Sequence, residues 1–97
     1  MAVTIIQQGG GFDAETYDKV VAAAGVNENP PEGLILHTAN RSGDQLEIID
    51  VWESEEQYDT FVNERLMPAM REVIGEMGEG TPAKRMEVHN MMGSGAP

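Results

Sequence analysis

The sequence predicts an α+β fold in which four antiparallel strands form one sheet and two helices pack on one of its faces. Segments with strand-like and with helical spacing alternate in the order strand, helix, strand, strand, helix, strand. Stretches rich in glycine and proline separate them. The 97 residues suit one domain with a single modest core. We place that domain at residues 1–92 and expect residues 93–97, "GSGAP", to form a flexible tail.

The first strand and the first helix are predicted from residue type and end signals. "VTIIQQ" (3–8) is mostly β-branched and apolar, and "GGG" (9–11) ends it. Asp13 can cap a helix that Gly25 stops, and "NENPPEG" (27–33) is a turn-rich connection. The apolar positions of that helix follow i, i+3, i+4, i+7 spacing: Tyr17, Val20, Val21 and Ala24.

The next two strands form a predicted hairpin. "LILHTAN" (34–40) and "QLEIIDVW" (45–52) flank "RSGD" (41–44), where Ser42 and Gly43 can make a tight loop. That loop places His37 opposite Ile48. One face of the hairpin then carries Leu34, Leu36, Ile49 and Val51. The other carries Ile35, His37, Ala39, Leu46, Ile48, Asp50 and Trp52.

The second half of the chain predicts a long helix and a closing strand. Ser54 and Gln57 form a capping box at the start of the helix. Its apolar stripe is Tyr58, Phe61, Val62, Leu66, Ala69 and Val73. Pro68 should kink or restart this helix, "GEGTP" (78–82) is a loop, and "AKRMEVHNMM" (83–92) is the last strand. This order matches the ferredoxin-like βαββαβ plan.

Both predicted faces of the hairpin are apolar, but two helices can cover only one of them. The purely aliphatic face suits the helices, so the mixed face needs another cover. A second copy of the chain, related by a two-fold axis, is the simplest cover. Apolar walls with a few polar groups are also typical of a small-molecule pocket.

Composition narrows the class of partner. The formal net charge is −11, from 17 acidic and 6 basic residues, which argues against binding to nucleic acid or to an anionic membrane. No segment has the basic start of a secretory signal or the roughly 18 apolar residues of a membrane span. The chain has no cysteine, so disulfides and thiol catalysis are excluded. We therefore expect a cytoplasmic protein.

Three motifs carry a resemblance to a known family. They are "DVWESEEQYDTF" between the third strand and the second helix, "RLMPAM" within that helix, and "VHNMM" near the end. Over residues 2–92 the chain resembles the dimeric α+β barrel superfamily, and within it the antibiotic biosynthesis monooxygenase (ABM)-like proteins. The resemblance implies a homodimeric α+β barrel with a small-molecule cavity and no cofactor.

The resemblance also implies roles for particular residues. In the characterised monooxygenases of this family, a tryptophan at the strand end and an aromatic hydroxyl six residues later line the site. Trp52 and Tyr58 stand at those positions. An asparagine that helps those enzymes is replaced here by Ile48, which argues against oxygenation. Haem-degrading relatives carry a histidine ligand where Val62 and Asn63 stand, which argues against haem breakdown.

The candidate catalytic residues are His37, Asp50 and Tyr58. Imidazole titrates near neutrality, so His37 is a candidate general base that an adjacent Asp50 would orient. Tyr58 can donate a hydrogen bond to a developing oxyanion. For each residue a structural role remains open: a hydrogen-bonded histidine, a paired buried carboxylate and a core aromatic.

The candidate substrate-binding residues are Trp52, Ile35, Ile48, Arg65 and His89. Trp52 can stack on a flat substrate or serve as a core aromatic. Arg65 can reach a substrate anion or pair with the acidic helix face. No partner for His89 follows from the sequence. The histidines and Asp50 lack the spacing of a metal motif, so we expect no metal site.

These residues leave several functions open. The first is a cofactor-independent monooxygenase that acts on a hydrophobic or aromatic metabolite. The second is a non-catalytic dimer that binds a small molecule. A non-oxidative isomerase or cyclase and a purely structural dimer are the remaining alternatives.

Overall fold

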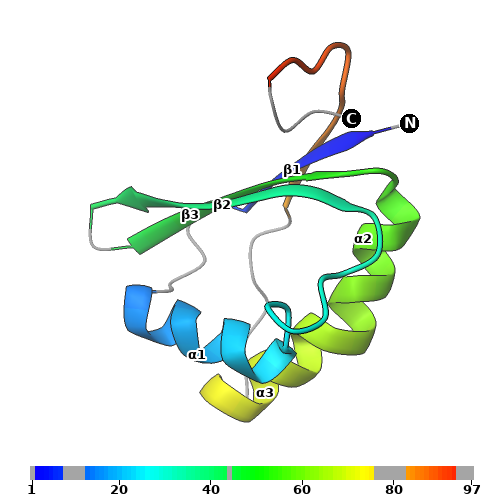
Figure 1. The fold of residues 1–97 in the computed structure, drawn as a ribbon. Coiled ribbons are helices and arrows are strands. Elements are labelled where there is room, and N and C mark those ends of the chain that lie inside the picture. The colour runs from blue at the N-terminus through cyan, green and yellow to red at the C-terminus, as the bar shows by residue number, and fades with distance from the viewer. Residues whose placement is uncertain (1, 8–12, 44, 76–82, 94–97) are drawn as a thin grey trace.

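The computed structural model describes residues 2–7, 13–43, 45–75 and 83–93. The elements are β1 (Val3–Gln7), α1 (Ala14–Ala24), β2 (Leu34–Ser42), β3 (Gln45–Trp52), α2 (Glu55–Phe61), a π-helical turn η1 (Val62–Leu66), α3 (Met67–Ile74) and β4 (Lys84–Glu87). The strands form one antiparallel sheet in the order β2-β3-β1-β4. The helices lie together on one side of it (Figure 1). The predicted α+β fold of ferredoxin-like order is confirmed.

Both predicted ends of α1 are present in the structure. Asp13 Oδ1 accepts a hydrogen bond of 2.8 Å from the backbone N–H of Thr16, which satisfies one of the free donors at the helix start. Gly25 adopts φ 68°, and its N–H bonds to the carbonyls of Val21 and Ala22. A left-handed residue at this place is the usual glycine stop. The predicted "GGG" and "GEGTP" turns lie outside the described residues.

The second helical segment restarts at Pro68, as predicted. Ser54 Oγ accepts from the backbone N–H of Gln57 at 3.2 Å and caps α2. Pro68 lies in the first turn of α3, where its missing N–H costs least. The wide turn η1 precedes it, and the N–H of Met67 there bonds to the carbonyl of Val62, five residues back.

Two predicted strand details are wrong. β4 ends at Glu87 rather than at residue 92. The structure describes β1 over Val3–Gln7, and Gln8, the last residue of the predicted first strand, lies outside the described residues. The hairpin pairs His37 directly with Asp50, two positions from the predicted partner. The cause is that pairing continues to Ser42 and Gln45, so the tight loop starts at Gly43, whose φ of 66° favours glycine.

A bulge in β2 changes the alternation of its first residues. The register shifts between Leu34 and Leu36, and Leu34 pairs with Trp52. The extra residue at the bulge breaks the regular inward and outward alternation. Leu34 therefore joins the face of Trp52, where the sequence predicted Ile35.

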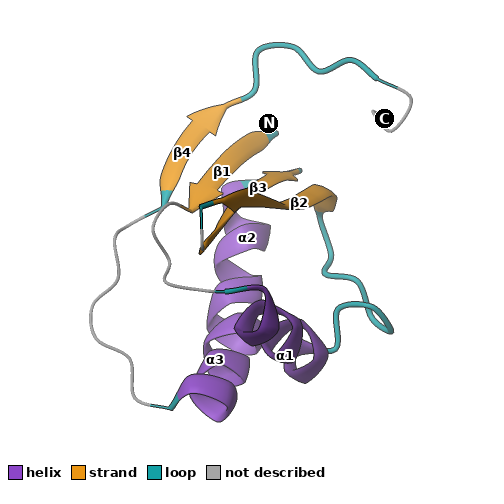
Figure 2. Ribbon diagram, turned by 90° about the vertical axis from the view of Figure 1, so that its left-hand side faces the viewer, coloured by secondary structure: helices purple, strands orange, loops and turns teal. Residues whose placement is uncertain are grey.

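The prediction that the helices cover the aliphatic face of the hairpin is also wrong. They cover the mixed face instead. Figure 2 shows the helices on one side of the sheet. The residues that face them are His37, Ile48, Asp50 and Trp52, which line a pocket together with residues of the helices. Val3 and Ile5 of β1, together with Trp52 and Tyr58, form the core beneath the helices. The mixed face can be buried because α1 and α2 supply aromatic and polar partners, which hydrophobicity alone does not reveal.

The other face of the sheet carries apolar side chains with polar ones around them; we call it the open face. Strand register assigns to it Thr4, Ile6, Leu36, Thr38, Asn40, Glu47, Ile49, Val51, Lys84 and Met86. Leu36 is 55% exposed and Met86 39%. The predicted surplus of apolar area therefore exists, but it lies on the aliphatic face.

Gly33, just before β2, packs closely against Gln57 of α2, and a substitution there tests this contact. Its φ is 91°, and an added Cβ would lie 2.9 Å from Gln57 Cβ and 2.4 Å from Gln57 Oε1. We expect Gly33→Ala to lower the free energy of unfolding by about 1–3 kcal/mol, measured in urea. Gly43→Ala is the matched control, because Gly43 also has positive φ but no neighbour within 4 Å of the added Cβ. Equal losses in both variants would contradict the role of the Gln57 contact.

Candidate active site

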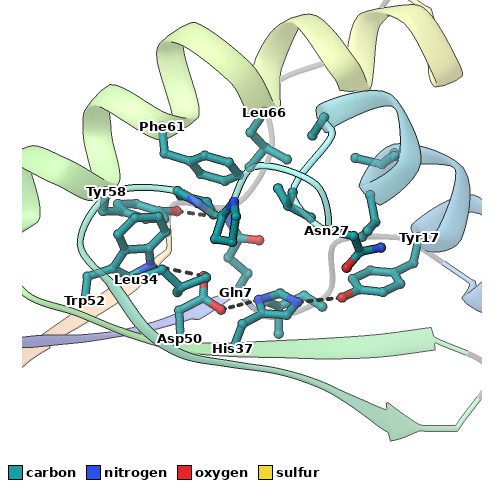
Figure 3. Close-up of a pocket in the computed structure, with 17 residues that line it drawn as sticks. Gln7, Tyr17, Asn27, Leu34, His37, Asp50, Trp52, Tyr58, Phe61 and Leu66 are labelled. Atoms are coloured by element: carbon teal, nitrogen blue, oxygen red, sulfur yellow. Dashed lines mark hydrogen bonds and ion pairs between the residues drawn. The ribbon is translucent and has the colours of Figure 1, made fainter. Parts of the chain in front are cut away.

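A pocket of about 240 Å³ lies between the covered face of the sheet and the helices. Its wall is largely apolar and comes from α1, the following loop, β2 and the second helical segment: Val20, Val21, Ala24, Pro30, Pro31, Leu34, Phe61 and Leu66. The polar side chains in its lining come from five elements and include Gln7, Tyr17, His37, Asp50, Trp52 and Tyr58 (Figure 3). Such a lining suits a small hydrophobic molecule with few polar groups.

Four of these side chains form one hydrogen-bonded chain, which we call the relay. Trp52 Nε1–H donates to Asp50 Oδ2 at 3.2 Å. The other carboxylate oxygen, Oδ1, lies 2.5 Å from His37 Nδ1, and His37 Nε2 lies 2.5 Å from the hydroxyl of Tyr17. Figure 3 shows the relay running along the sheet side of the pocket from the indole to α1.

The relay fixes the direction of its hydrogen bonds. An ionised carboxylate only accepts, so Asp50 takes the proton-bearing Nδ1 of His37 on one oxygen and the indole N–H on the other. Nε2 of a neutral His37 is then the acceptor, and Tyr17 O–H is the donor. The imidazole is thus held in the tautomer that can take up a proton at Nε2.

Burial differs along the relay. The Asp50 side chain is 11% exposed, whereas that of His37 is 34% exposed. Burial raises the pKa of Tyr17, and the negative charges of Asp50 and Asp18 raise it further. Tyr17 is therefore a neutral hydroxyl at neutral pH.

Tyr58 supplies a second hydroxyl in the pocket. It accepts a hydrogen bond of 2.9 Å from Gln7 Nε2. Burial raises the pKa of Tyr58, although the bond from Gln7 acts in the opposite direction. The Tyr58 ring meets Trp52 edge to face with centroids 5.6 Å apart, and Arg85 lies 5.2 Å from its centroid.

Trp52 is a buried wall of the pocket. It is 1% exposed and packs between Tyr58 and Phe61, whose ring centroid lies 5.4 Å from the indole. Its burial and its bond to Asp50 make it part of the scaffold that holds the carboxylate.

The structure brings together five of the eight predicted site residues: His37, Asp50, Tyr58, Trp52 and Ile48 all line the pocket. Ile35, Arg65 and His89 do not line it. The β2 bulge gives the place of Ile35 to Leu34. Arg65 Nη2 donates to the carbonyl of Ala24 at 2.8 Å, so it closes the end of α1. His89 follows the end of β4 and is exposed.

Sequence reasoning missed Tyr17 and Gln7 as pocket groups. The sequence places Tyr17 in the apolar stripe of α1. Its hydroxyl is the one feature that could have indicated a polar role for this side of the helix. Gln7 ends β1 on the covered face and had no distinguishing spacing. Contacts such as Tyr17 to His37 join residues 20 positions apart, which local patterns do not encode.

Two features are absent from the described residues. Among them, no three His, Cys, Asp or Glu side chains gather as metal ligands. None of the helices in the described part of the chain is long and apolar enough to cross a membrane.

Comparisons with known proteins place the fold. No protein-family model matches the chain, and no curated protein matches it significantly in sequence. Among solved structures, a candidate antibiotic biosynthesis monooxygenase from Chloroflexus aurantiacus superposes with a TM-score of 0.62 at 9% identity, covering 95% of both chains. A protein of unknown function from Nitrosomonas europaea gives a TM-score of 0.61 at 17% identity, over 94% of this chain and 90% of that one.

A third neighbour is a mutant of MhuD with two manganese protoporphyrin IX molecules bound per active site. It matches with a TM-score of 0.51 at 19% identity, over 97% of this chain and 100% of that one. The chain therefore has the fold of the ABM-like proteins, as its sequence resemblance implied.

Proposed function

We propose that the protein is an ABM-like enzyme, a cofactor-independent monooxygenase acting on a hydrophobic or aromatic metabolite held in the pocket. One observation carries the proposal: a buried carboxylate orients a histidine along the wall of an otherwise apolar pocket. A base in that setting can remove a proton from a substrate that the apolar wall shields from water.

The proposed reaction needs an electron-rich substrate and dioxygen. The base takes a proton from the substrate, and the resulting anion passes one electron to dioxygen. Recombination forms a carbon–oxygen bond to a peroxide. At a ring CH2 group, loss of water from the peroxide then leaves a carbonyl, so that one oxygen atom enters the product and the other leaves as water. The Tyr58 hydroxyl can donate to the developing oxyanion.

The size of the pocket supports a compact ligand. Its volume of about 240 Å³ lies just below the usual range of ligand pockets, roughly 300–1,000 Å³. A relative by fold holds two porphyrins per active site. For this chain we propose a smaller substrate, of the size of a few fused rings.

We also propose that the protein is a homodimer that pairs through the open face. Leu36 and Met86 are exposed there beside other apolar side chains. A second copy would remove this apolar area from water without blocking the pocket, which lies on the opposite side of the sheet.

His37→Ala tests the enzymatic proposal. With an anthrone-type substrate, we expect oxygen consumption to fall about 10²–10⁴-fold, because the base is lost. His89→Ala is the matched control, since it removes the other histidine, which lies outside the pocket lining. Substrate binding is followed separately by quenching of Trp52, the only tryptophan. Unchanged turnover in His37→Ala would refute the assignment of the base.

A second candidate function is binding without catalysis. The observation that favours it is the occupied Nε2 of His37, which already accepts from Tyr17. Quenching of Trp52 by aromatic ligands with no product would identify this function. Turnover that continues without oxygen would instead identify an isomerase or cyclase.

A further inference from the structure

We infer that Tyr17 is the group that meets the substrate proton, and that the substrate is a hydroxyaromatic compound whose O–H proton passes through Tyr17 to His37. This inference rests on the proposed function, because it requires that the pocket bind a small aromatic molecule. It changes the role of His37 from direct base to second member of the relay.

The geometry of His37 leaves no ring nitrogen free for a substrate. Nδ1 lies 2.5 Å from Asp50 Oδ1, and Nε2 lies 2.5 Å from the Tyr17 hydroxyl. The Tyr17 and His37 rings are nearly parallel, at 7°, with centroids 5.9 Å apart. The Tyr17 oxygen donates its own proton but keeps acceptor capacity, and Tyr17 lines the pocket. A ligand donor therefore finds its acceptor at Tyr17.

The proton transfer balances along this path. The O–H bond of the substrate breaks, and its proton binds the Tyr17 oxygen. The original Tyr17 proton moves at the same time to Nε2 of His37. The result is a substrate phenolate, a neutral Tyr17 and an imidazolium that Asp50 stabilises through Nδ1. No oxidant is consumed in this step.

The chemistry of the relay favours a hydroxyl substrate over a carbon acid. A proton on oxygen passes readily between hydrogen-bonded hydroxyl groups, because each hydroxyl donates and accepts at once. Burial and the charges of Asp50 and Asp18 keep the pKa of Tyr17 above its ordinary value. Tyr17 therefore transmits the proton rather than storing a negative charge.

The experiment uses 4-nitrophenol, a phenol whose ionised form absorbs visible light. Quenching of Trp52 measures its binding, and absorbance at one fixed pH measures the ionised fraction of the bound probe. We expect the wild-type protein to raise the ratio of phenolate to phenol about tenfold over buffer, which corresponds to one pKa unit. This increase would occur against a net charge of −11, which by itself opposes a bound anion.

Three variants locate the acceptor. Tyr17→Phe keeps the ring that lines the pocket, so we expect binding to remain within about threefold and the ionised fraction to fall to that in buffer. His37→Asn should lose the ionisation in the same way. His89→Asn removes the other histidine, which does not line the pocket, so the ionisation should persist. Far-ultraviolet circular dichroism checks the fold of each.

The outcomes separate this inference from the proposed function. Ionisation that survives in Tyr17→Phe but is lost in His37→Asn overturns the role of Tyr17 and leaves the proposed function standing. A bound probe that stays neutral on the wild-type protein also overturns the relay. If the probe does not bind at all, both the inference and the proposed pocket fall.

Discussion

Asp50→Asn will leave the chain folded but will reduce any reaction that depends on His37 by about 10²–10⁴-fold. Asparagine has the shape of aspartate, yet its amide offers one acceptor and one donor group. The oxygen can keep the bond from Trp52 Nε1–H. The NH2 group then faces Nδ1 of His37, which must become the acceptor.

The consequence is a change of tautomer. With Nδ1 accepting, a neutral His37 carries its proton on Nε2 and can only donate to Tyr17. It can no longer take up a proton there. Nitrogen chemical shifts of the imidazole, measured by NMR, should show the exchange of the protonated nitrogen between wild type and Asp50→Asn.

Asp50→Leu is the companion variant. Leucine leaves both the indole N–H and the imidazole N–H without an acceptor, and Asp50 is only 8% exposed. We expect a loss of about 1–3 kcal/mol in the free energy of unfolding, larger than for asparagine. An Asp50→Asn protein that keeps the wild-type tautomer and full turnover would show that the carboxylate does not direct His37.

Ile49→Glu will convert the proposed dimer into monomers. Ile49 lies on the open face of β3, paired with Ile6 and Thr38 of the neighbouring strands. In a two-fold dimer both subunits contribute the same surface, so the interface would contain two glutamates. Both negative charges would be buried without partners. The expected cost is about 3 kcal/mol, roughly a hundredfold rise in Kd. Sedimentation velocity over a range of micromolar concentrations measures it.

Ala23→Glu is the control for this substitution. Ala23 is exposed on α1, outside the open face, and the change adds the same charge to the chain. We expect it to sediment as wild type. A wild-type protein that sediments as a monomer, or an Ile49→Glu protein as dimeric as wild type, would refute pairing through this face.

The parts of the fold that the sequence could predict depend on local chemistry. Asp13, Gly25 and Ser54 mark helix ends through their own caps, and Pro68 restarts the second segment because proline lacks an N–H. These effects act within one helical turn. The order of elements follows from them and from strand residue types.

The faces of the sheet could not be predicted in the same way. Aliphatic content suggested that the helices would cover the face with Leu36 and Val51, but they cover the face with His37 and Asp50. On that face Tyr17 of α1 bonds His37, so a polar side chain of the sheet has a partner on a helix. That contact depends on how α1 lies across the sheet, which no single segment specifies.

The candidate site could likewise be predicted only in part. The strand position of Asp50 and the helix position of Tyr58 could be read from spacing. The direct His37–Asp50 pairing depended on where the hairpin turned. Moving the loop by one residue along the chain shifts the partner of every strand residue by two positions. The β2 bulge, which exchanged Ile35 for Leu34, had no signal in residue type.

The wide turn η1 sets the phase between two halves of one long helix. Because its pairing runs five residues back, Leu66 returns to the side of Phe61, and both reach the same pocket. A homologue lacking one residue between 62 and 66 would wind as a regular helix through this stretch, and the same face of the following helix would still point toward the sheet. Alignments of distant homologues should therefore allow a single-residue gap there before any comparison of the side chains on α3.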